Sequence, residues 1–500
     1  MENLHSLLYG FSVALQPNNL FLVFVGCFLG TLVGVLPGIG PVGAISILLP
    51  LTFQMTPTGS IIMLAGIYYG VMYGGSTTSI LVNVPGETAS VVTCMDGYQM
   101  ARQGRAGSAL GIAAFGSFIA GTIGLIGLQF IAAPLSAIAL KFGPPEYFAI
   151  ILLGFTFVTY LSHGSMLKAG IMAFFGLVLS TIGLDPINSQ QRMTFGVLNL
   201  FEGLGVAPIA MGLFGVAEVF NSLEKTTSTK ILNVKIRNLF PNKLDWLQSK
   251  WAILRGTLIG FFLGILPGGG PVLSTFIAYG VEKRVAKNPE RFGHGAIEGV
   301  ASPEAANNSA TSTSFIPLMT LGIPPNVVLA VLYGAFLIHG ILPGPLLIKE
   351  HPDVFWGLLG SMYIGNVMLL ILNLPLIPLW VQVLRIPDKI LYPLILLFCV
   401  IGAYCINNNV FDIFVMVAFG IFGYLCKKFG YEGAPLILGL VLGPMFEVNL
   451  RRSLLISQGS FSIFFTRPIA LIAIVVCAVL LLFNIYSTFA GKSRSEIVSE

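Results

Sequence analysis

Long apolar runs follow one another along almost the whole chain, with short polar or glycine- and proline-rich breaks between them. In the first half they cover roughly 20–36, 41–53, 60–73, 108–140, 147–161, 166–184 and 205–221, and in the second half 251–266, 271–281, 326–348, 354–384, 390–406, 410–426, 433–446 and 468–489. Several exceed the ~20 residues that a membrane-crossing helix needs, and several fall short. The pattern predicts an all-α polytopic membrane protein with about 10 to 14 membrane segments.

One stretch occurs twice. Residues 26–42 read GCFLGTLVGVLPGIGPV, and residues 256–272 read GTLIGFFLGILPGGGPV. Identical residues stand at nine of the 17 aligned positions, and most of the other substitutions stay apolar. The chain therefore contains an internal repeat.

Each copy combines a glycine face with a break. Glycines at every fourth position (Gly26, Gly30, Gly34 and Gly256, Gly260, Gly264) let a second helix approach closely in lipid. The Leu-Pro-Gly-x-Gly-Pro that follows cannot stay helical. Broken backbone at membrane depth occurs where it is packed in protein or lines a wet cavity. A tight helix corner would explain one copy, but two copies in matching places are typical of a secondary transporter.

Polar clusters follow both breaks. Residues 74–87 read GGSTTSILVNVPGE, and residues 305–314 read AANNSATSTS. Each hydroxyl could simply bond to its own helix, but whole clusters beside a broken backbone favour a binding site. If helices begin at the two breaks, their free N–H groups and positive dipole ends would suit a carboxylate. The substrate-binding candidates are Gly38, Gly40, Gly268, Gly270, Ser76, Thr77, Thr78, Asn83, Asn307, Asn308 and Thr311.

Acidic residues are rare inside the apolar regions, and such residues are functional candidates by default. Glu304 and Glu87 lie closest to the repeated elements. They are the candidates for a coupling-ion site, binding Na+ or a proton; the alternative is that they lie at the membrane interface.

Composition agrees with a membrane protein, since 55% of the 500 residues are hydrophobic and 9% are charged, with a mean hydropathy of +0.88. The net charge of +5 is modest, and its basic residues lie in loops, which does not suggest nucleic acid. The sequence GIGPVG at 38–43 matches a dinucleotide fingerprint, but it lacks the surrounding strand and helix pattern. No phosphate-binding loop and no zinc-ligand spacing occur. We therefore expect no enzyme, no cofactor and no metal site.

Charge also divides the chain. We predict a first membrane repeat at 1–221, a basic cytoplasmic connector at 222–255, a second repeat with C-terminal helices at 256–490, and a polar tail at 491–500. Residues 51–59 after the first break hold no Lys or Arg, whereas Lys283, Arg284, Lys287 and Arg291 follow the second. This opposite bias predicts two homologous repeats with inverted topology and broken or re-entrant helices. The second break would form the tip of a re-entrant hairpin.

The motifs together resemble a known family. They are the two LPGxGP sequences, VPGE with DGYQMARQG at 96–104, PEAANNSA at 303–310, LGIP at 321–324, and LILGLVLGPMFEVNLRRSLLISQGSFSIFFTRPI at 436–469. The chain resembles the large membrane subunit of tripartite tricarboxylate transporters, the TctA type, over roughly 20–470. The resemblance implies a multi-pass permease in the bacterial cytoplasmic (inner) membrane. It also implies a small four-helix membrane subunit, a periplasmic solute-binding protein that delivers a carboxylate, and a Na+ or proton gradient.

Two departures concern the substrate. Thr77-Thr78 stands where the family suggests an isoleucine-proline pair, and serines at 457–460 stand where an acidic residue is usual. The leading interpretation is a permease subunit for tricarboxylates or dicarboxylates. Alternatives are a stand-alone carrier of organic anions and a channel.

Overall fold

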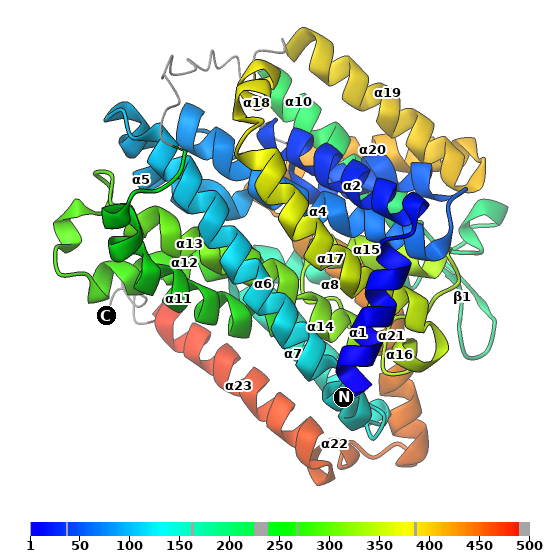
Figure 1. Cartoon of the computed structure of the whole chain (residues 1–500). Coiled ribbons are helices and arrows are strands. Elements are labelled where there is room, and N and C mark those ends of the chain that lie inside the picture. The colour runs from blue at the N-terminus through cyan, green and yellow to red at the C-terminus, as the bar shows by residue number, and fades with distance from the viewer. Residues whose placement is uncertain are drawn as a thin grey trace.

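The computed structural model describes residues 2–36, 39–161, 165–224, 239–266, 268, 270–384 and 388–489. Nearly all of them are helical, and they form one thick bundle (Figure 1). Figure 1 shows α19 along one edge of the bundle, α23 along the opposite edge, and the long α6 crossing between them. The structure is thus all-α, as the apolar runs predict.

The α-helices of the first half are α1 (Glu2–Ala14), α2 (Pro17–Val35), α3 (Gly40–Leu48), α4 (Pro57–Val82), α5 (Val91–Arg102), α6 (Ala106–Ala139), α7 (Pro144–Leu161), α8 (Met166–Ser180), α9 (Val206–Ala210) and α10 (Ala217–Glu224). Those of the second half are α11 (Lys243–Ile265), α12 (Gly270–Val285), α13 (Glu298–Thr313), α14 (Phe315–Leu321), α15 (Val327–Ile338), α16 (Leu347–Glu350), α17 (Pro352–Asn373), α18 (Ile377–Val383), α19 (Asp388–Asn407), α20 (Val410–Lys428), α21 (Ala434–Ile456), α22 (Ile463–Thr466) and α23 (Pro468–Phe489). Shorter turns are η1 (Leu49–Thr52), η2 (Thr88–Ser90), η3 (Leu198–Leu200), the π-helical η4 (Met211–Val216) and η5 (Pro289–Arg291). A two-residue hairpin pairs β1 (Gly183–Leu184) with β2 (Gln191–Arg192) in antiparallel fashion.

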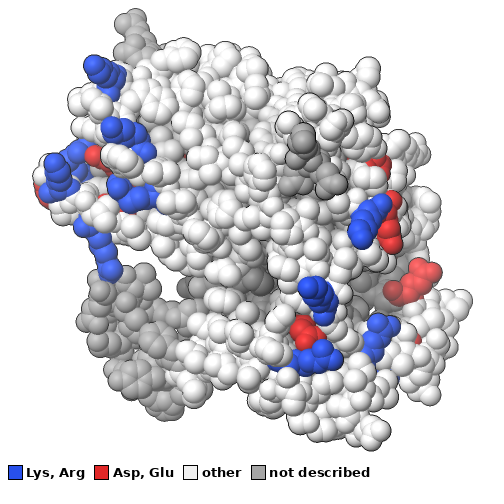
Figure 2. Space-filling model, turned by 60° about the horizontal axis from the view of Figure 1, so that its bottom comes forward, with Lys and Arg blue, Asp and Glu red and all other residues white. Residues whose placement is uncertain are grey.

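Seven helices are long and apolar enough to cross a membrane, among the residues that the structure describes. Six shorter apolar helices accompany them. On the face drawn in Figure 2, charged side chains gather at two opposite sides and leave a broad white band between them. These features make the chain a multi-pass membrane protein; the number of 10 to 14 segments stays a prediction.

The centre of the bundle is formed by α4 and α13. All residues of α4 from Thr58 to Val82 are buried, and so are all residues of α13 from Gly299 to Thr313. A helix that is buried on every side needs neighbours all round rather than one apolar face. For α13 these neighbours include α6, α11 and α12.

The glycine faces of the repeated stretches contact these central helices backbone to backbone. A Cβ atom added at Gly30 of α2 would lie 2.5 Å from the carbonyl oxygen of Ile67 in α4. A Cβ atom added at Gly260 of α11 would lie 2.2 Å from the carbonyl oxygen of Ala306 in α13. Both distances are shorter than any real contact of a Cβ atom. α2 and α4, and likewise α11 and α13, therefore pack this closely only because glycine stands at these positions.

Within each of these pairs, the two helices are parallel. In the first pair, successive contacts along α2 (Gly26, Gly30, Gly34) fall on successive residues of α4 (Met63, Ile67, Val71). In the second pair, Gly256 and Gly260 of α11 contact Ser302 and Ala306 of α13 in the same order. The two pairs run in opposite directions. Ser76 contacts Glu304, whereas Tyr68, two turns earlier in α4, packs against the tilted ring of Phe315, which lies further along the chain than Glu304. An inverted repeat requires this antiparallel arrangement. The predicted repeat boundaries and the inverted topology stay predictions.

The breaks start new helices, as the sequence predicts. α3 begins at Gly40 and α12 begins at Gly270, and both glycines have positive φ angles, +64° and +58°. Arg255 of α11 forms an ion pair with Glu282 of α12 at 2.6 Å. These residues lie at equal sequence distance from the break, so α11 and α12 form a helical hairpin with both charged ends on one side. The predicted tip residues Pro267 and Gly269 lie outside the described residues, as do 225–238 of the connector and the tail.

Ion pairs fix the β1–β2 hairpin to the end of α21. Arg451 of α21 donates to Asp185 at 2.7 Å, and Arg192 donates to Glu447 of α21 at 2.7 Å. The hairpin projects from the bundle (Figure 1). Further along the same connection, Phe195 is 86% exposed.

Candidate functional site

The central feature of the molecule is a group of buried polar side chains between the antiparallel α4 and α13. We call it the carboxyl cluster; its members are Ser76, Ser79, Glu87, Ser90, Thr93, Ser117, Glu304, Asn307 and Asn308. They come from α4, η2 with its preceding loop, α5, α6 and α13. All are buried, and both halves of the chain contribute. Their helices carry small residues at the contacts, which lets several polar side chains converge in one place.

Glu304 accepts hydrogen bonds through both carboxyl oxygens. Ser76 donates to Oε2 at 2.7 Å, and Thr93 donates to Oε1. One donor belongs to α4 and the other to α5, so Glu304 joins α13 to two helices of the first half. Two hydroxyl donors on one carboxyl are the pattern that an ionised carboxylate accepts.

Glu87 lies in the loop after α4 and caps η2. Its Oε2 accepts from the backbone N–H of Ala89, and its Oε1 accepts from Asn307 Nδ2 at 3.4 Å. The close approach of this loop to α4 depends on Gly75, where an added Cβ would lie 2.9 Å from Glu87 Cγ. Residues 75 and 76 of α4 therefore contact Glu87 and Glu304, respectively, so the two carboxyls lie in one region.

The two asparagines of α13 differ in their bonding. Asn308 Nδ2 donates to Ser117 Oγ at 2.7 Å and to the carbonyl oxygen of Glu304 at 3.2 Å. Asn307 is fully buried, and its Oδ1 has no hydrogen-bond partner among the described residues. A buried polar atom without a partner is costly, so its presence points to a missing donor or cation.

Among the residues that the structure describes, no basic side chain pairs with the carboxyl cluster. Within the described part of the chain, the ion pairs involve ten other acid–base combinations and neither Glu87 nor Glu304. An ionised carboxylate that is buried without a partner is strongly unfavourable. The arrangement can therefore take up a proton or a cation, as the sequence predicts for these two glutamates; the assignment stays a prediction.

A line of polar groups leads from the cluster to the second break. Thr311, one turn after Asn307, donates to the carbonyl oxygen of Asn307 and lies beside the hydroxyl of Tyr68. Asn326 Nδ2 donates to the same Tyr68 hydroxyl at 3.3 Å. An added Cβ at Gly270 would lie 3.5 Å from Asn326. Gly270, Asn307 and Thr311 thus belong to one connected polar region.

Other predicted site residues have different surroundings. Thr78 donates to the carbonyl oxygen of Val35 at 2.6 Å and so joins α4 to α2. Thr77 is buried in the same turn of α4. Asn83 is exposed and ends α4 in the left-handed conformation, with φ 59°. Gly268 donates its N–H to the carbonyl oxygen of Pro325 at 2.7 Å. Gly38 lies outside the described residues.

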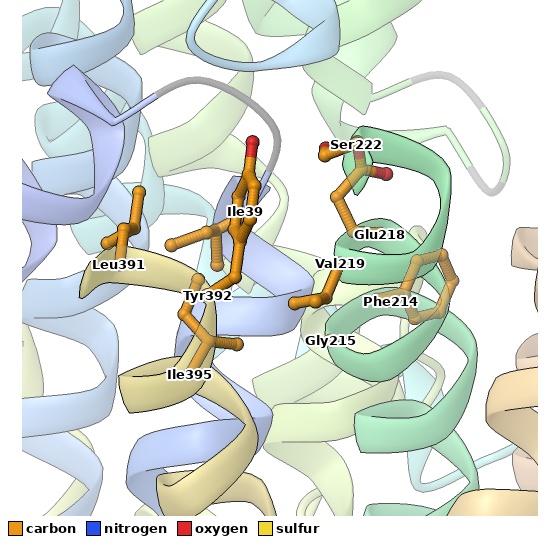
Figure 3. Close-up of a pocket in the computed structure, with 9 residues that line it drawn as sticks. All are labelled: Ile39, Phe214, Gly215, Glu218, Val219, Ser222, Leu391, Tyr392 and Ile395. Atoms are coloured by element: carbon orange, nitrogen blue, oxygen red, sulfur yellow. The ribbon is translucent and has the colours of Figure 1, made fainter. Parts of the chain in front are cut away.

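The first break has a small cavity of its own. Ile39 lines it together with side chains from η4, α10 and α19, among them Glu218, Ser222 and Tyr392 (Figure 3). Its volume is about 10 Å3, which is room for about one water molecule. Glu218 also pairs with Lys427 of α20. The cavity is too small for a carboxylate in this conformation.

Sequence reasoning missed four residues of this region: Tyr68, Thr93, Ser117 and Asn326. Tyr68 lies in an apolar run, and Ser117 lies in a helix of small residues, so neither stands out in the sequence. Asn326 stands two residues after LGIP, and Thr93 stands a few residues after VPGE; their proximity to those motifs was the available signal.

Comparison with known proteins gives a family. The model of the "Tripartite tricarboxylate transporter TctA family" matches residues 20–438. The chain is 53% identical over 470 residues to an uncharacterized 52.8 kDa protein in the TAR-I ttuC' 3' region of Agrobacterium vitis, with 94% of each chain covered. It is also 56% identical over 211 residues to an uncharacterized protein in the TAR-II ttuC' 3' region of the same organism, covering 42% of this chain and 87% of that one. No solved structure matches it.

Proposed function

Since this chain belongs to the tripartite tricarboxylate transporter TctA family, we propose that it is the permease subunit of a binding-protein-dependent secondary transporter. It imports tricarboxylates or dicarboxylates across the bacterial cytoplasmic membrane. A Na+ or proton gradient drives the uptake. Membership of this family makes the chain a component of a tricarboxylate transporter. The dependence on a binding protein and the use of an ion gradient are our proposal.

The observation that carries the proposal is the carboxyl cluster between the antiparallel α4 and α13. Secondary transporters bind substrate and ion near the midplane, where broken helices from two halves meet. Glu87 and Glu304 are buried without a basic partner in the described part of the chain, and groups of this kind mark ion and proton sites in membrane proteins. A channel needs no such buried exchangeable site, so the cluster favours a carrier.

The carboxylate substrate is proposed to bind at the helix starts, with the amide and hydroxyl groups around them. α12 begins at Gly270, next to Asn326 and Tyr68, and offers free N–H groups there. α3 begins at Gly40, where an added Cβ would meet nothing within 4 Å. A change of conformation that enlarges the space at either break would admit a substrate.

Two partners belong to the proposal by family resemblance: a small four-helix membrane subunit and a periplasmic solute-binding protein. The second candidate function is a stand-alone carrier that takes its anion directly from solution. The two candidates differ in one measurable property, the need for the binding protein.

The experiment is uptake of labelled citrate and of a panel of dicarboxylates into proteoliposomes that hold this chain and its small subunit. Gradient-driven uptake that requires the binding protein supports the proposal, and uptake without it supports the stand-alone carrier. Gly40→Leu and Gly270→Leu should abolish uptake, because leucine strains a positive φ and fills the helix starts. If no carboxylate is taken up under any gradient, the proposed function is wrong.

A further inference from the structure

The unpartnered oxygen of Asn307 identifies a specific position within the carboxyl cluster. Asn307 follows Glu304 by three residues in α13, so their side chains lie on the same face of the helix. Its Nδ2 points toward Glu87, at 3.4 Å from Oε1. Asn307 therefore lies between the two glutamates, and its Oδ1 is buried there without a donor.

We propose that Glu87, Asn307 and Glu304 form a Na+ site for the coupling ion, with ligands from both halves of the chain. This inference rests on the proposed function. The available donors are carboxylate, amide and hydroxyl oxygens, which suit a hard cation. A cation placed between the glutamates would give Asn307 Oδ1 its partner, and Na+ would neutralise one of the two carboxylate charges.

The hydrogen bonds of the cluster favour a monovalent ion over Ca2+. Calcium sites commonly use bidentate carboxylates and six to eight oxygens in total. Both carboxyl oxygens of Glu304 already accept from Ser76 and Thr93, and those of Glu87 accept from the backbone of Ala89 and from Asn307 Nδ2. Each oxygen therefore has one lone pair left, and bidentate binding would compete with these hydrogen bonds, in keeping with a low coordination number and one positive charge.

A proton is the competing occupant of the same carboxyls, but it leaves one observation without an explanation. Protonating Glu87 or Glu304 would remove the charge, yet Asn307 Oδ1 would gain a partner only if a carboxyl proton turned toward it. Among the described residues, Tyr68, Tyr73 and Cys94 are further titratable groups near the glutamates. Direct ion binding distinguishes the two occupants.

The test uses the purified full-length chain with its small subunit, in detergent and without substrate, so that the result does not depend on transport. Binding of radioactive 22Na+ and the rise of the melting temperature with Na+ are measured at fixed pH and ionic strength, with K+ or choline as replacement. The wild type should bind about one Na+ per chain and melt at a higher temperature in Na+. Asn307→Ala should raise the half-saturating Na+ concentration by at least about tenfold, because it removes a ligand.

Asn373→Ala is the matched control. Asn373 is also a buried asparagine whose Oδ1 lacks a partner among the described residues, but it lies on α17, outside the cluster. Its substitution should leave the half-saturating Na+ concentration unchanged. Asn307→Asp keeps the oxygen and the size of the side chain, so it should retain Na+ binding where alanine loses it.

The possible outcomes distinguish the Na+ site from the proposed transport function. Wild-type protein that neither binds 22Na+ nor gains thermal stability overturns the Na+ site, whether or not the variants fold. Equal effects of Asn307→Ala and Asn373→Ala also overturn it. Uptake driven by a pH gradient in protein that does not bind Na+ leaves the proposed function standing and removes the ion assignment. Na+ binding without uptake of any carboxylate leaves the ion assignment standing and removes the proposed function.

Discussion

Buried hydroxyl groups in this protein serve two different purposes. Ser314 and Thr320 donate to carbonyl oxygens one turn back in their own helices, at 2.6 Å each. Ser76 and Thr93 instead donate across helices to Glu304. The first kind satisfies a polar group locally, whereas the second kind links two halves of the molecule around a buried acid.

Ser76→Ala tests whether the cross-helix hydrogen bonds matter for function. Alanine removes one donor from Glu304, and a hydrogen bond to a charged group contributes about 1.5–3 kcal/mol. We expect gradient-driven uptake per folded protein to fall by about tenfold or more.

Ser361→Ala is the control, because Ser361 is a fully buried serine that donates to its own helix at Leu358. The amount of folded protein is measured by fluorescence-detected gel filtration. Uptake divided by this amount should stay within about twofold of wild type for this variant. Equal losses in the two variants would refute a special role of Ser76.

At this scale the sequence could predict candidates but not their partners. It singled out Glu87, Glu304, Ser76 and Asn307, which the structure brings together. It also grouped Thr78 with them, although that hydroxyl bonds to α2. A hydroxyl that bonds within its helix and one that bonds across helices look alike in a single sequence, because the difference depends on which helix packs next to it.

The helices are held by glycine faces and by a few charged contacts at their ends. The periodic glycines of α2 and α11 predicted close packing correctly, because a repeat of small residues every four positions is specific to one helix face. The partner helices carry matching small residues, Gly66, Gly70 and Gly74 in α4 and Ser302, Ala306 and Ala310 in α13. Their pairing with α2 and α11 was not predictable, because a single sequence does not show which of its small-residue faces pack together. The exact helix ends at the breaks followed from proline and glycine chemistry.

Gly30→Ala should destabilise the protein. The added Cβ would lie 2.5 Å from a backbone oxygen of α4, so the two helices must separate. Overpacking of this kind costs about 1–3 kcal/mol. The expected result is a lower melting temperature in detergent and less folded protein in the membrane.

Gly170→Ala is the matched control, because Gly170 lies within α8 and an added Cβ meets nothing within 4 Å. Alanine in a helix interior is favoured over glycine by about 0.5–1 kcal/mol, so this variant should be as stable as wild type or more stable. A stable Gly30→Ala protein would contradict the backbone contact between α2 and α4.

The β1–β2 hairpin provides a prediction about pH. The backbone N–H of Ile187 lowers the pKa of Asp185 to about 2, with further contributions from Arg451 and the N–H of Asn188. An unfolded aspartate has a pKa of about 3.9. Because the folded value is the lower one, the carboxylate stabilises the fold fully above about pH 4, and this contribution is lost as the pH falls toward about 2.

The measurement is the melting temperature of the wild type and of Asp185→Asn between about pH 5 and pH 2, since that interval contains both pKa values. The wild type should lose its advantage over the variant as the pH falls through this interval. If the melting temperatures of the two proteins change in parallel with pH, the pKa of Asp185 is not lowered by these contacts.

For the whole molecule, the charge bias in the loops predicted two repeats of opposite orientation. α4 and α13 run in opposite directions, which such repeats require, and the inverted topology itself stays a prediction. The number of membrane segments was harder to predict, because short helices such as α3 and α15 are apolar without being long enough to cross. Length alone does not distinguish a short re-entrant helix from a crossing one.

Cysteine labelling tests the topology. Gln54 follows α3 and η1, Lys287 follows α12, and both are exposed. In a background without the native cysteines, Gln54→Cys and Lys287→Cys should react with a membrane-impermeant reagent from opposite faces of the membrane. Labelling from the same face would exclude the inverted arrangement, and Phe195→Cys, which is also exposed, confirms that the reagent reaches the protein.

The backbone contacts of α2 with α4 and of α11 with α13 have a mechanical consequence. Each pair is stiff, because interlocked backbones cannot slide without a clash. The seam between the pairs is softer, since hydrogen bonds such as Ser76 to Glu304 can be exchanged for water. Deformation therefore concentrates at the seam, and whatever occupies the carboxyl cluster sets the force needed to open the molecule along it.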